Sequence, residues 1–275
     1  MIFILLPAYN EEGGIKQVLN RIGQLFKDTH EIFRIVVVDD GSRDRTSQFV
    51  REFSQKLDIK LFVFEQNQGV GEVFKTGFKY ICDESLDPDQ DICIILDADN
   101  TQDPRVMTSM IDAIRGGEDI VIASRFKKPG MMRGCSWTRH LYSHTLSLLM
   151  GLTVRLRGVK DYSMFFRAYR VRVLKQGFQR YGDALLAGRG FSAIAGCLVR
   201  LSNVTHRIVE VPFVLRYGKK RGKSGIRIFK TILGYFELIG ECIRTDRYRK
   251  WAAPISLPVS AAKGGQRNEE STVSP

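Results

Sequence analysis

The stretch DICIILDADN, residues 91–100, decides how the first half of the chain folds. Its apolar run is typical of a strand that is buried on both faces, and its last residues are polar. Because side chains alternate along a strand, Asp97 and Asp99 are expected on the same side, where their like charges repel each other. A cation, basic side chains or solvent must offset that repulsion.

Similar strand and helix units surround this stretch. The apolar runs MIFILLP, FRIVVVDD, KLFVFEQ and DIVIAS are separated by helical patterns at regular spacing. Helices are predicted from Ile15 to Phe26, from about Thr46, through Val73 and after Pro104. Continuous apolar strands that alternate with helices predict an α/β fold, with a doubly wound, mostly parallel sheet and helices on both faces.

Polar residues gather where each predicted strand ends. The segments are PAYNEE, DDGSRD, NQGVG, DADN and SRF. The carboxyl ends of parallel strands share one edge of the sheet, and open α/β sheets bind their ligands there. We therefore expect one binding site assembled from these five segments.

The segment VVVDDGSRDRT, residues 36–46, places Asp39 and Asp40 at a strand end before a glycine turn. Carboxylates at this place are able to accept hydrogen bonds from a base or a ribose. No GxGxxG follows the first strand, so a dinucleotide-dependent dehydrogenase is disfavoured. Asp44 and Thr46 are better explained as caps of the following helix.

The net charge of +12 is divided unevenly between the two halves of the chain. Residues 1–124 carry 13 Lys and Arg against 22 Asp and Glu, a net charge of −9, and residues 125–275 carry 29 against 8, a net charge of +21. An anionic partner for the second half is expected: nucleic acid, phosphate or an acidic membrane. A nucleic-acid-binding protein is the less favoured interpretation, because the sequence has no stacking aromatics interleaved with the arginines. That function would also leave the acidic strand ends unexplained.

The five cysteines show no paired spacing, which predicts reduced thiols rather than disulfides or a zinc site. The N-terminal MIFILLPAYN is interpreted as a first strand and not as a signal peptide. No run reaches the roughly 18 apolar residues of a spanning helix, so the chain is not expected to cross a bilayer.

The second half has fewer strand signals and more basic residues. A helix is predicted from about Trp137 to Thr153, and a basic loop, RYGKKRGKSG, covers residues 216–225. An amphipathic helix follows over 226–251, with Phe229 and Phe236 on its apolar side. Residues 252–275 have no periodicity and are expected to be disordered.

Six segments of the chain, taken in order, resemble those of a family 2 glycosyltransferase of the GT-A fold. They are PAYNEE, IVVVDDGSRDRT, NQGVGEVFKTGF, ILDADNTQDP, IASRF and VKDYSMFFRAYR. Within that family they resemble dolichyl-phosphate or polyprenyl-phosphate mannosyltransferase-like enzymes. The resemblance implies a glycosyltransferase domain over 1–225, with a nucleotide-sugar-binding half at 1–124 and an acceptor half at 125–225. The helix at 226–251 would then lie in a membrane interface.

The resemblance also implies roles for single residues. Those implied to bind the nucleotide sugar are Pro7, Tyr9, Glu11, Asp39 and Asp40. Asp97 and Asp99 would hold Mg²⁺ or Mn²⁺ and the diphosphate, which suits the oxygen ligands these ions prefer. Many relatives have a glutamine at the position of Thr101, so the neighbouring Gln102 is the candidate third ligand. Arg125 would stabilise the leaving group.

The residues implied to bind an acceptor phosphate are Arg139, Ser143, Arg216, Lys223 and Ser224. The spacing of four puts Arg139 and Ser143 on one helical face. The chain departs from many relatives at Phe165, where they have glycine. It also lacks an acidic residue near the start of RGFSAIAGCLVRL.

The implied reaction is inverting transfer of a sugar, with mannose or glucose favoured, from a nucleotide sugar to a polyprenyl phosphate at the cytoplasmic face of a membrane. GDP-mannose leads among the donors, followed by UDP-sugars. A saccharide or protein hydroxyl is the alternative acceptor, and it would require a catalytic carboxylate, for which Asp161 and Asp183 are the candidates. A nucleotidyltransferase is disfavoured, because its glycine-rich, lysine-bearing N-terminal loop is absent.

Overall fold

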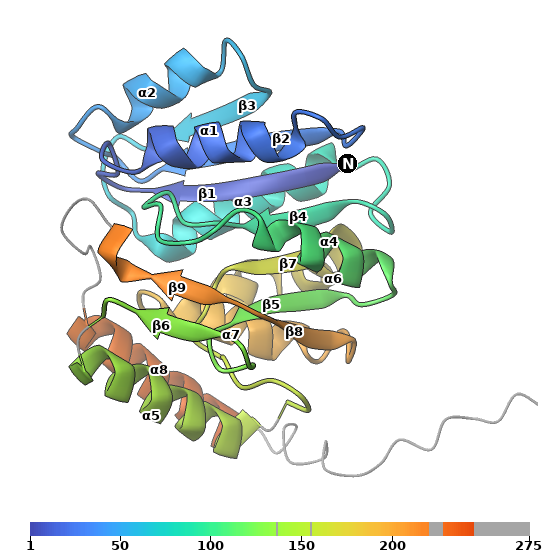
Figure 1. The fold of residues 1–275 in the computed structure, drawn as a ribbon. Helices are drawn as coiled ribbons and strands as arrows, with labels where there is room; N and C mark the ends of the chain where they lie inside the picture. Colours follow the sequence, from blue (N-terminus) through green and yellow to red (C-terminus); the bar gives the residue numbers. More distant parts are fainter. Residues whose placement is uncertain (136, 155, 220–227, 245–275) are drawn as a thin grey trace, which may run out of the picture.

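The computed structural model describes residues 1–135, 137–154, 156–219 and 228–244 (Figure 1). Its centre is a seven-stranded sheet in the order β3-β2-β1-β4-β7-β5-β8. The strands are β1 (Ile2–Ala8), β2 (Phe33–Asp39), β3 (Ile59–Val63), β4 (Ile92–Ile95), β5 (Ile120–Ser124), β7 (Arg167–Arg170) and β8 (Ile208–Pro212). Neighbouring strands are parallel, except that β7 is antiparallel to both β4 and β5.

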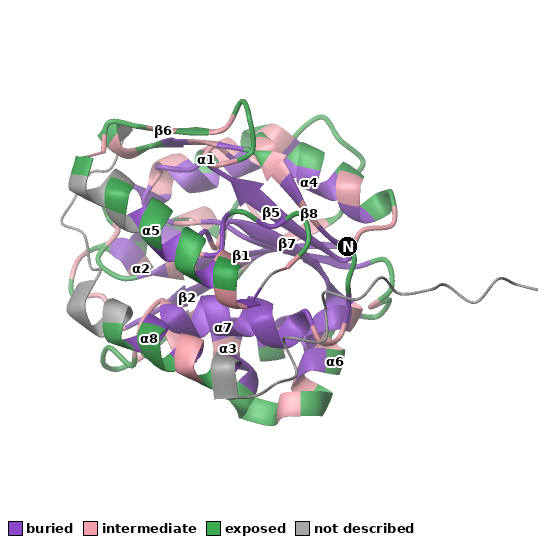
Figure 2. Cartoon of the chain, turned by 90° about the horizontal axis from the view of Figure 1, so that it is seen from below, coloured by how far each residue is buried: buried purple, intermediate pink, exposed green. Residues whose placement is uncertain are grey.

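Helices cover both faces of this sheet, which confirms the predicted doubly wound architecture. They are α1 (Ile15–Phe26), α2 (Thr46–Phe53), α3 (Val70–Glu84), α4 (Val106–Arg115), α6 (Val171–Tyr181) and α7 (Ser192–Leu201), with a 3₁₀ turn, η1 (Gly182–Leu186). Helices α1 and α4 lie on one face, and α3, α6 and α7 lie on the other (Figures 1 and 2). Figure 2 shows the buried residues concentrated in the sheet and in α7.

Strand β7 was not visible in the sequence as a strand, because its four residues, RAYR, begin and end with arginine. Both arginines are buried, and both donate hydrogen bonds to residues outside the strand. The Arg167 guanidinium donates to the carbonyl oxygens of Tyr162 and Ile194, and the Arg170 Nε donates to Asp119. Tertiary partners, and not an apolar pattern, therefore hold this strand in the sheet.

A second unit adjoins the β8 edge of the sheet. It contains the two-stranded ribbon of β6 (Met131–Arg133) and β9 (Val214–Arg216), the 3₁₀ turn η2 (Tyr217–Lys219), and two long helices, α5 (Trp137–Val154) and α8 (Ile228–Arg244). Helix α8 packs against α7 and lies beside α5 (Figure 1). Within the described ranges, none of the helices combines the length and hydropathy that crossing a membrane requires.

All five cysteines are free thiols, as predicted. Four of them are buried, and Cys135, which lies between β6 and α5, is partly exposed. The expected helix at 226–251 is present over 228–244. The predicted domain boundary at residue 225 and the predicted tail at 252–275 lie outside the described residues.

Candidate active site

The loops after β1 and β2 form one side of the site, because each donates hydrogen bonds to the other. The Asn10 N–H donates to the Ser42 Oγ at 2.8 Å, and the Glu11 N–H donates to the Thr46 Oγ1 at 2.9 Å. The Glu12 N–H donates to the Asp44 carboxylate at 3.1 Å. These contacts join the PAYNEE and DDGSRD segments into a single rim.

The structure corrects part of the expectation that Asp44 and Thr46 cap α2. The residue at the N-cap position is Arg45, whose own side chain makes no capping hydrogen bond. The Asp44 carboxylate accepts the N–H of Thr46, the first helical residue, at 2.9 Å, whereas the Thr46 hydroxyl donates to Asp44 and accepts the Glu11 N–H from the neighbouring loop. Sequence spacing could not reveal this choice, because the competing partner comes from the loop after β1.

Asp39, at the end of β2, is fully buried. Its carboxylate accepts the Ser42 N–H at 2.8 Å and also the hydroxyl of Ser47. The other predicted nucleotide-binding residues of β1 and its loop lie at the same edge, with Pro7 half-buried and Tyr9 39% exposed. Their contact with a nucleotide remains a prediction.

Asp40 organises the turn that leads into α3. Its carboxylate accepts the side-chain amide of Asn67 at 2.8 Å and the backbone N–H groups of Gln68 at 2.7 Å and Gly69 at 3.0 Å. Burial raises the pKa of Asp40, and the two backbone donors oppose that rise. These contacts give Asp40 a structural task in addition to its predicted role toward the nucleotide.

The turn after β4 presents Asp97 and fixes it through Gln102. The Gln102 Nε2 donates to the Asp97 Oδ2 at 2.7 Å, while the Gln102 Oε1 accepts the Asp97 N–H at 3.0 Å. Gln102 is buried. Its amide therefore positions Asp97, and its role as a third metal ligand remains a prediction that this geometry does not favour.

Asp99 is fixed in a similar way by Thr101, whose N–H and hydroxyl donate to the Asp99 Oδ1 at 3.0 and 2.6 Å. Between them Asn100 adopts a φ of 62°, and its side-chain oxygen accepts the Arg21 Nη1 at 2.9 Å. The Arg21 Nη2 donates to Asp103 at 2.8 Å. An arginine of α1 thus clamps the whole turn.

The donor set of this turn suits a divalent cation that is shared with a substrate. Asp97 and Asp99 supply carboxylate oxygens, and no cluster of three or more His, Cys, Asp or Glu that could hold a metal occurs among the residues the structure describes. Mg²⁺ typically takes one or two protein carboxylates and completes its shell with phosphate oxygens and water. The residues present therefore fit an ion that is bound together with a diphosphate.

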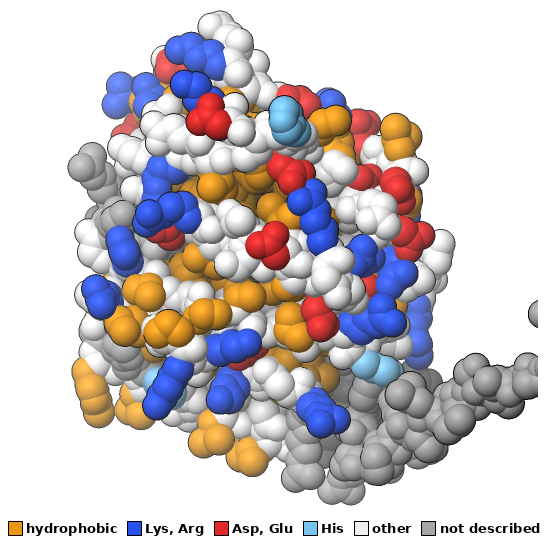
Figure 3. Space-filling view, turned by 45° about the vertical axis from the view of Figure 1, so that its right-hand side comes forward, with side chains coloured by type: hydrophobic (Ala, Val, Ile, Leu, Met, Phe, Trp, Pro, Cys, Tyr) orange, Lys and Arg blue, Asp and Glu red, His pale blue; other side chains and the backbone are white. Residues whose placement is uncertain are grey.

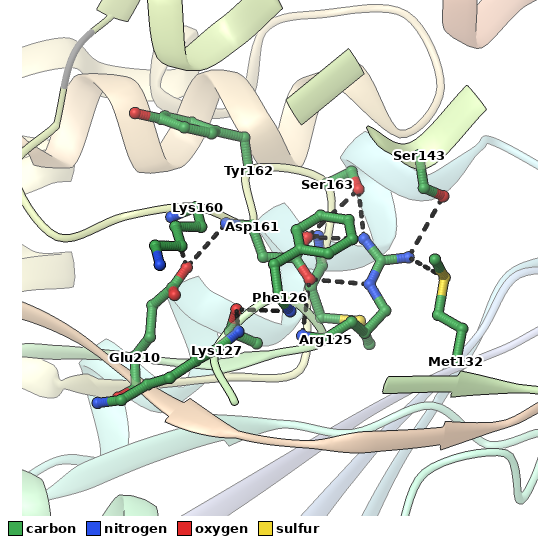
Figure 4. Close-up of polar contacts among 12 residues, drawn as sticks. Arg125, Phe126, Lys127, Met132, Ser143, Lys160, Asp161, Tyr162, Ser163 and Glu210 are labelled. Carbon is green, nitrogen blue, oxygen red and sulfur yellow. Dashed lines mark hydrogen bonds and ion pairs between the residues drawn. The ribbon is translucent and has the colours of Figure 1, made fainter. Parts of the chain in front are cut away.

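Arg125, directly after β5, forms a buried ion pair with Asp161 (Figure 4). The Arg125 Nη2 and Nε donate to the two Asp161 oxygens at 2.6 and 2.8 Å, and Nη2 also donates to the Ser163 Oγ at 2.6 Å. Burial alone would raise the pKa of Asp161, but the charge and hydrogen bonds of Arg125 outweigh it and hold the pKa below its usual range.

The other end of the same guanidinium faces the acceptor half. Arg125 Nη1 lies 3.5 Å from the Ser143 Oγ, on α5, and 3.8 Å from the Met132 sulfur, on β6. A hydroxyl oxygen and a thioether sulfur are both weaker hydrogen-bond acceptors for a guanidinium than a carboxylate is. The structure therefore brings together Arg125 and Ser143, which the sequence assigned to the donor and the acceptor side respectively.

Glu210 supports this pair from β8, and sequence reasoning missed it. Its Oε1 accepts the backbone N–H groups of Lys160 and Asp161, both at 2.7 Å (Figure 4). Its own carbonyl oxygen accepts the Lys127 Nζ at 2.6 Å. The signal available in the sequence was a glutamate inside an otherwise apolar strand, IVEVP.

Of the remaining residues predicted to bind the acceptor, the structure describes Arg216 fully and Arg139 only as part of a helix. Arg216 ends β9, is exposed, and donates its N–H to the Thr101 carbonyl oxygen at 3.2 Å, so it lies beside the Asp97–Asp99 turn. Arg139 lies in α5, and its side chain is outside the described part of the structure. Lys223 and Ser224 lie outside the described residues.

The two carboxylates that a hydroxyl acceptor would require are both committed elsewhere. Asp161 is fully buried and paired with Arg125. Asp183, on η1, is exposed and paired with Lys79 at 2.6 Å and Lys75 at 3.6 Å. Neither carboxylate is arranged as a general base, which weighs against that alternative.

The acidic strand ends, the Asp97–Asp99 turn and the buried Arg125 all lie at the carboxyl edge of an open α/β sheet, which is where such sheets bind their ligands. The sequence profile of glycosyl transferase family 2 matches residues 3–178. The chain belongs to this family, which confirms the resemblance inferred from its motifs.

Two curated relatives and one solved structure illustrate the similarity. The dolichol-phosphate mannosyltransferase of Pyrococcus furiosus is 29% identical over 92% of this chain, which spans 65% of that protein. An undecaprenyl-phosphate 4-deoxy-4-formamido-L-arabinose transferase of Edwardsiella ictaluri is 27% identical over 90% of this chain and 69% of its own length.

The solved structure is glucosyl-3-phosphoglycerate synthase from Mycobacterium tuberculosis, in complex with Mn²⁺, UDP and glucosyl-3-phosphoglycerate. Its TM-score is 0.61 at 19% identity, and the match covers 87% of this chain and 80% of that one. This likeness confirms the predicted GT-A fold.

Proposed function

We propose that the chain transfers a sugar from a nucleotide sugar to a polyprenyl phosphate, with inversion at the anomeric carbon. The observation that carries the proposal is the contact between Arg125 and Ser143, because it joins the predicted donor side and the predicted acceptor side at one cation. The names of the two curated relatives support the acceptor, since both contain a polyprenyl or dolichol phosphate while their sugars differ.

In this mechanism the loops after β1 and β2 hold the base and ribose of the donor. Asp97 and Asp99, fixed by Gln102 and Thr101, would hold Mg²⁺ or Mn²⁺. When bound, the ion supplies Lewis-acid stabilisation of the diphosphate. The basic side chains of Arg125 and Arg216 add positive charge next to the phosphate groups.

The acceptor needs no strong general base. A phosphate monoester has its second pKa at about 6, so its oxygen is already anionic near neutral pH. That oxygen forms the new bond to the anomeric carbon, and the nucleoside diphosphate departs with the electron pair of the bond that breaks. The protein contributes alignment of the two substrates and charge stabilisation.

The surface of α5 and α8 supports a place at the membrane interface. Large apolar side chains on both helices are exposed: Trp137, Leu141, Leu148, Leu149 and Leu152 on α5, and Leu233 and Phe236 on α8. Figure 3 shows hydrophobic side chains at the lower edge of the molecule, among basic ones. Such a surface suits partial insertion beside anionic headgroups. We include binding at the cytoplasmic face in the proposal.

The test is transfer of labelled sugar from GDP-mannose, UDP-glucose and UDP-N-acetylglucosamine to a short polyprenyl phosphate, with and without Mn²⁺. Asp97→Asn and Asp99→Asn should each lower the transfer rate by more than about a hundredfold. Mutating residues that only hydrogen-bond to metal ligands already lowers metal affinity or activity by about ten- to a hundredfold. Label on a saccharide hydroxyl alone would favour the alternative acceptor. A folded protein that labels no acceptor from any donor would contradict the proposal.

A further inference from the structure

Two arginine side chains lie next to each other on the ribbon of β6 and β9. The strands run parallel, and their register pairs Arg133 with Arg216. Both side chains are exposed. Together with Gly134 and Gly218 they line an open depression of about 360 Å³.

This pairing places two positive charges close together, and a bound anion would stabilise it. Like charges directly opposite each other on neighbouring strands destabilise the pair. Among the described residues, no ion pair includes Arg133 or Arg216. The Arg133 Nε donates to the Met131 sulfur at 3.1 Å, which is a weak acceptor. The repulsion therefore has no protein carboxylate to offset it in the described structure.

The ribbon that carries the two arginines lies beside the predicted catalytic groups. The Arg216 N–H donates to the Thr101 carbonyl oxygen at 3.2 Å, which attaches β9 to the Asp97–Asp99 turn. At the middle of β6, the Met132 sulfur contacts the Arg125 Nη1. The ribbon thus extends from the predicted diphosphate site to the buried arginine.

We propose that Arg133 and Arg216 bind one phosphoryl group between them, which makes Arg133 a substrate-binding residue that the sequence motifs did not identify. The proposal rests on the proposed function, because the phosphoryl group would belong to the donor diphosphate or to the acceptor phosphate. Guanidinium groups suit this task, since their planar forks donate paired hydrogen bonds to phosphate oxygens. The bound anion would also remove the repulsion between the two side chains.

The test compares the full chain with Arg133→Gln and Arg133→Lys by equilibrium binding of two probes. Inorganic pyrophosphate with Mn²⁺ represents the donor, and geranyl phosphate represents the acceptor. We expect Arg133→Gln to lower the affinity for one of the two probes by about tenfold, as for a lost charge-assisted hydrogen bond. Lys keeps the charge but loses the fork, so its effect should be smaller. Arg51→Gln, an exposed arginine on α2 at the far edge of the sheet, should change neither.

The outcomes separate the two sources of phosphate. If Arg133→Gln loses affinity only for pyrophosphate, Arg133 and Arg216 bind the donor. If it loses affinity only for geranyl phosphate, they bind the acceptor. The proposal is wrong if Arg133→Gln binds both probes like the wild type, or if the wild type binds neither. Probe binding without sugar transfer would contradict the proposed function alone, and transfer with unchanged probe binding would contradict the arginine pair alone.

Discussion

The Arg125 side chain shows how one residue acquires its role from its partners. The family resemblance of the segment SRF assigned it to the leaving group. In the structure two of its nitrogen atoms bind Asp161, and the third faces Ser143. Asp161 is therefore a positioning residue, because it orients the guanidinium and leaves one end directed toward α5.

Replacing Asp161 with Asn should destabilise the protein by about 3–5 kcal/mol, because it leaves Arg125 buried without a compensating charge. Urea unfolding at neutral pH would measure this loss. Asp58→Asn provides the matched control, since Asp58 pairs with Arg34 at the surface and should contribute about 1 kcal/mol or less. Equal losses for the two variants would contradict the assignment of a buried pair.

The same pair predicts a pH dependence. The pKa of Asp161 in the folded state lies below its usual value of 3.8. Its contribution is therefore complete above that usual value and is lost as the pH falls through the folded-state pKa. The difference in unfolding free energy between the wild type and Asp161→Asn should be constant from about pH 5 upward and shrink in acid. A difference that grows in acid would contradict this.

At the scale of elements, α1 and the Asp97–Asp99 turn depend on each other. Arg21, on α1, reaches the turn from the middle of the helix. Gly14, just before the helix, approaches it so closely that an added Cβ would lie 2.7 Å from the Ala98 carbonyl oxygen and 2.9 Å from the Asp99 backbone. The glycine is needed for this close approach and not for an unusual φ, which is −119°.

Gly14→Ala should therefore displace the turn. We expect a loss of about 1–3 kcal/mol in stability, as for other overpacked sites, together with weaker Mn²⁺ binding. Thermal unfolding and Mn²⁺ titration would measure the two effects. Gly23→Ala, in the same helix, is the control, because its nearest atom is a Leu57 side-chain methyl at 3.2 Å. Unchanged Mn²⁺ affinity in Gly14→Ala would show that the turn does not rely on this contact.

Across the whole molecule, the acidic and basic halves meet at the carboxyl edge of the sheet. The first half contributes the carboxylates after β2 and β4, and the second half contributes Arg125 and Arg216 beside them. An exposed apolar surface lies on α5 and α8, which belong to the same basic half (Figure 1). This arrangement would let a lipid phosphate reach the cations while its tail stays in the bilayer.

The double variant Leu148→Asp and Phe236→Asp should bind vesicles that contain anionic phospholipid at least about tenfold more weakly than the wild type, because each apolar side chain contributes free energy when it leaves water. Vesicle co-sedimentation would measure this. Leu86→Asp is the matched control, since Leu86 is 97% exposed but lies on the loop after α3. The same loss in both proteins, or none in either, would contradict a membrane role for α5 and α8.

The sequence by itself determined the α/β alternation, the polar strand ends and the carboxylate pair at residues 97 and 99. These features are local: burial on both faces dictates apolar strands, and a site at strand ends follows from parallel pairing. Only the tertiary structure decided that β7 enters the sheet between β4 and β5, that Arg125 pairs with Asp161, and that Arg133 lies opposite Arg216. Each of these features depends on which distant segments become neighbours. The partner of a buried charged residue can be assigned only when the strand order is known, because the partner comes from a distant segment.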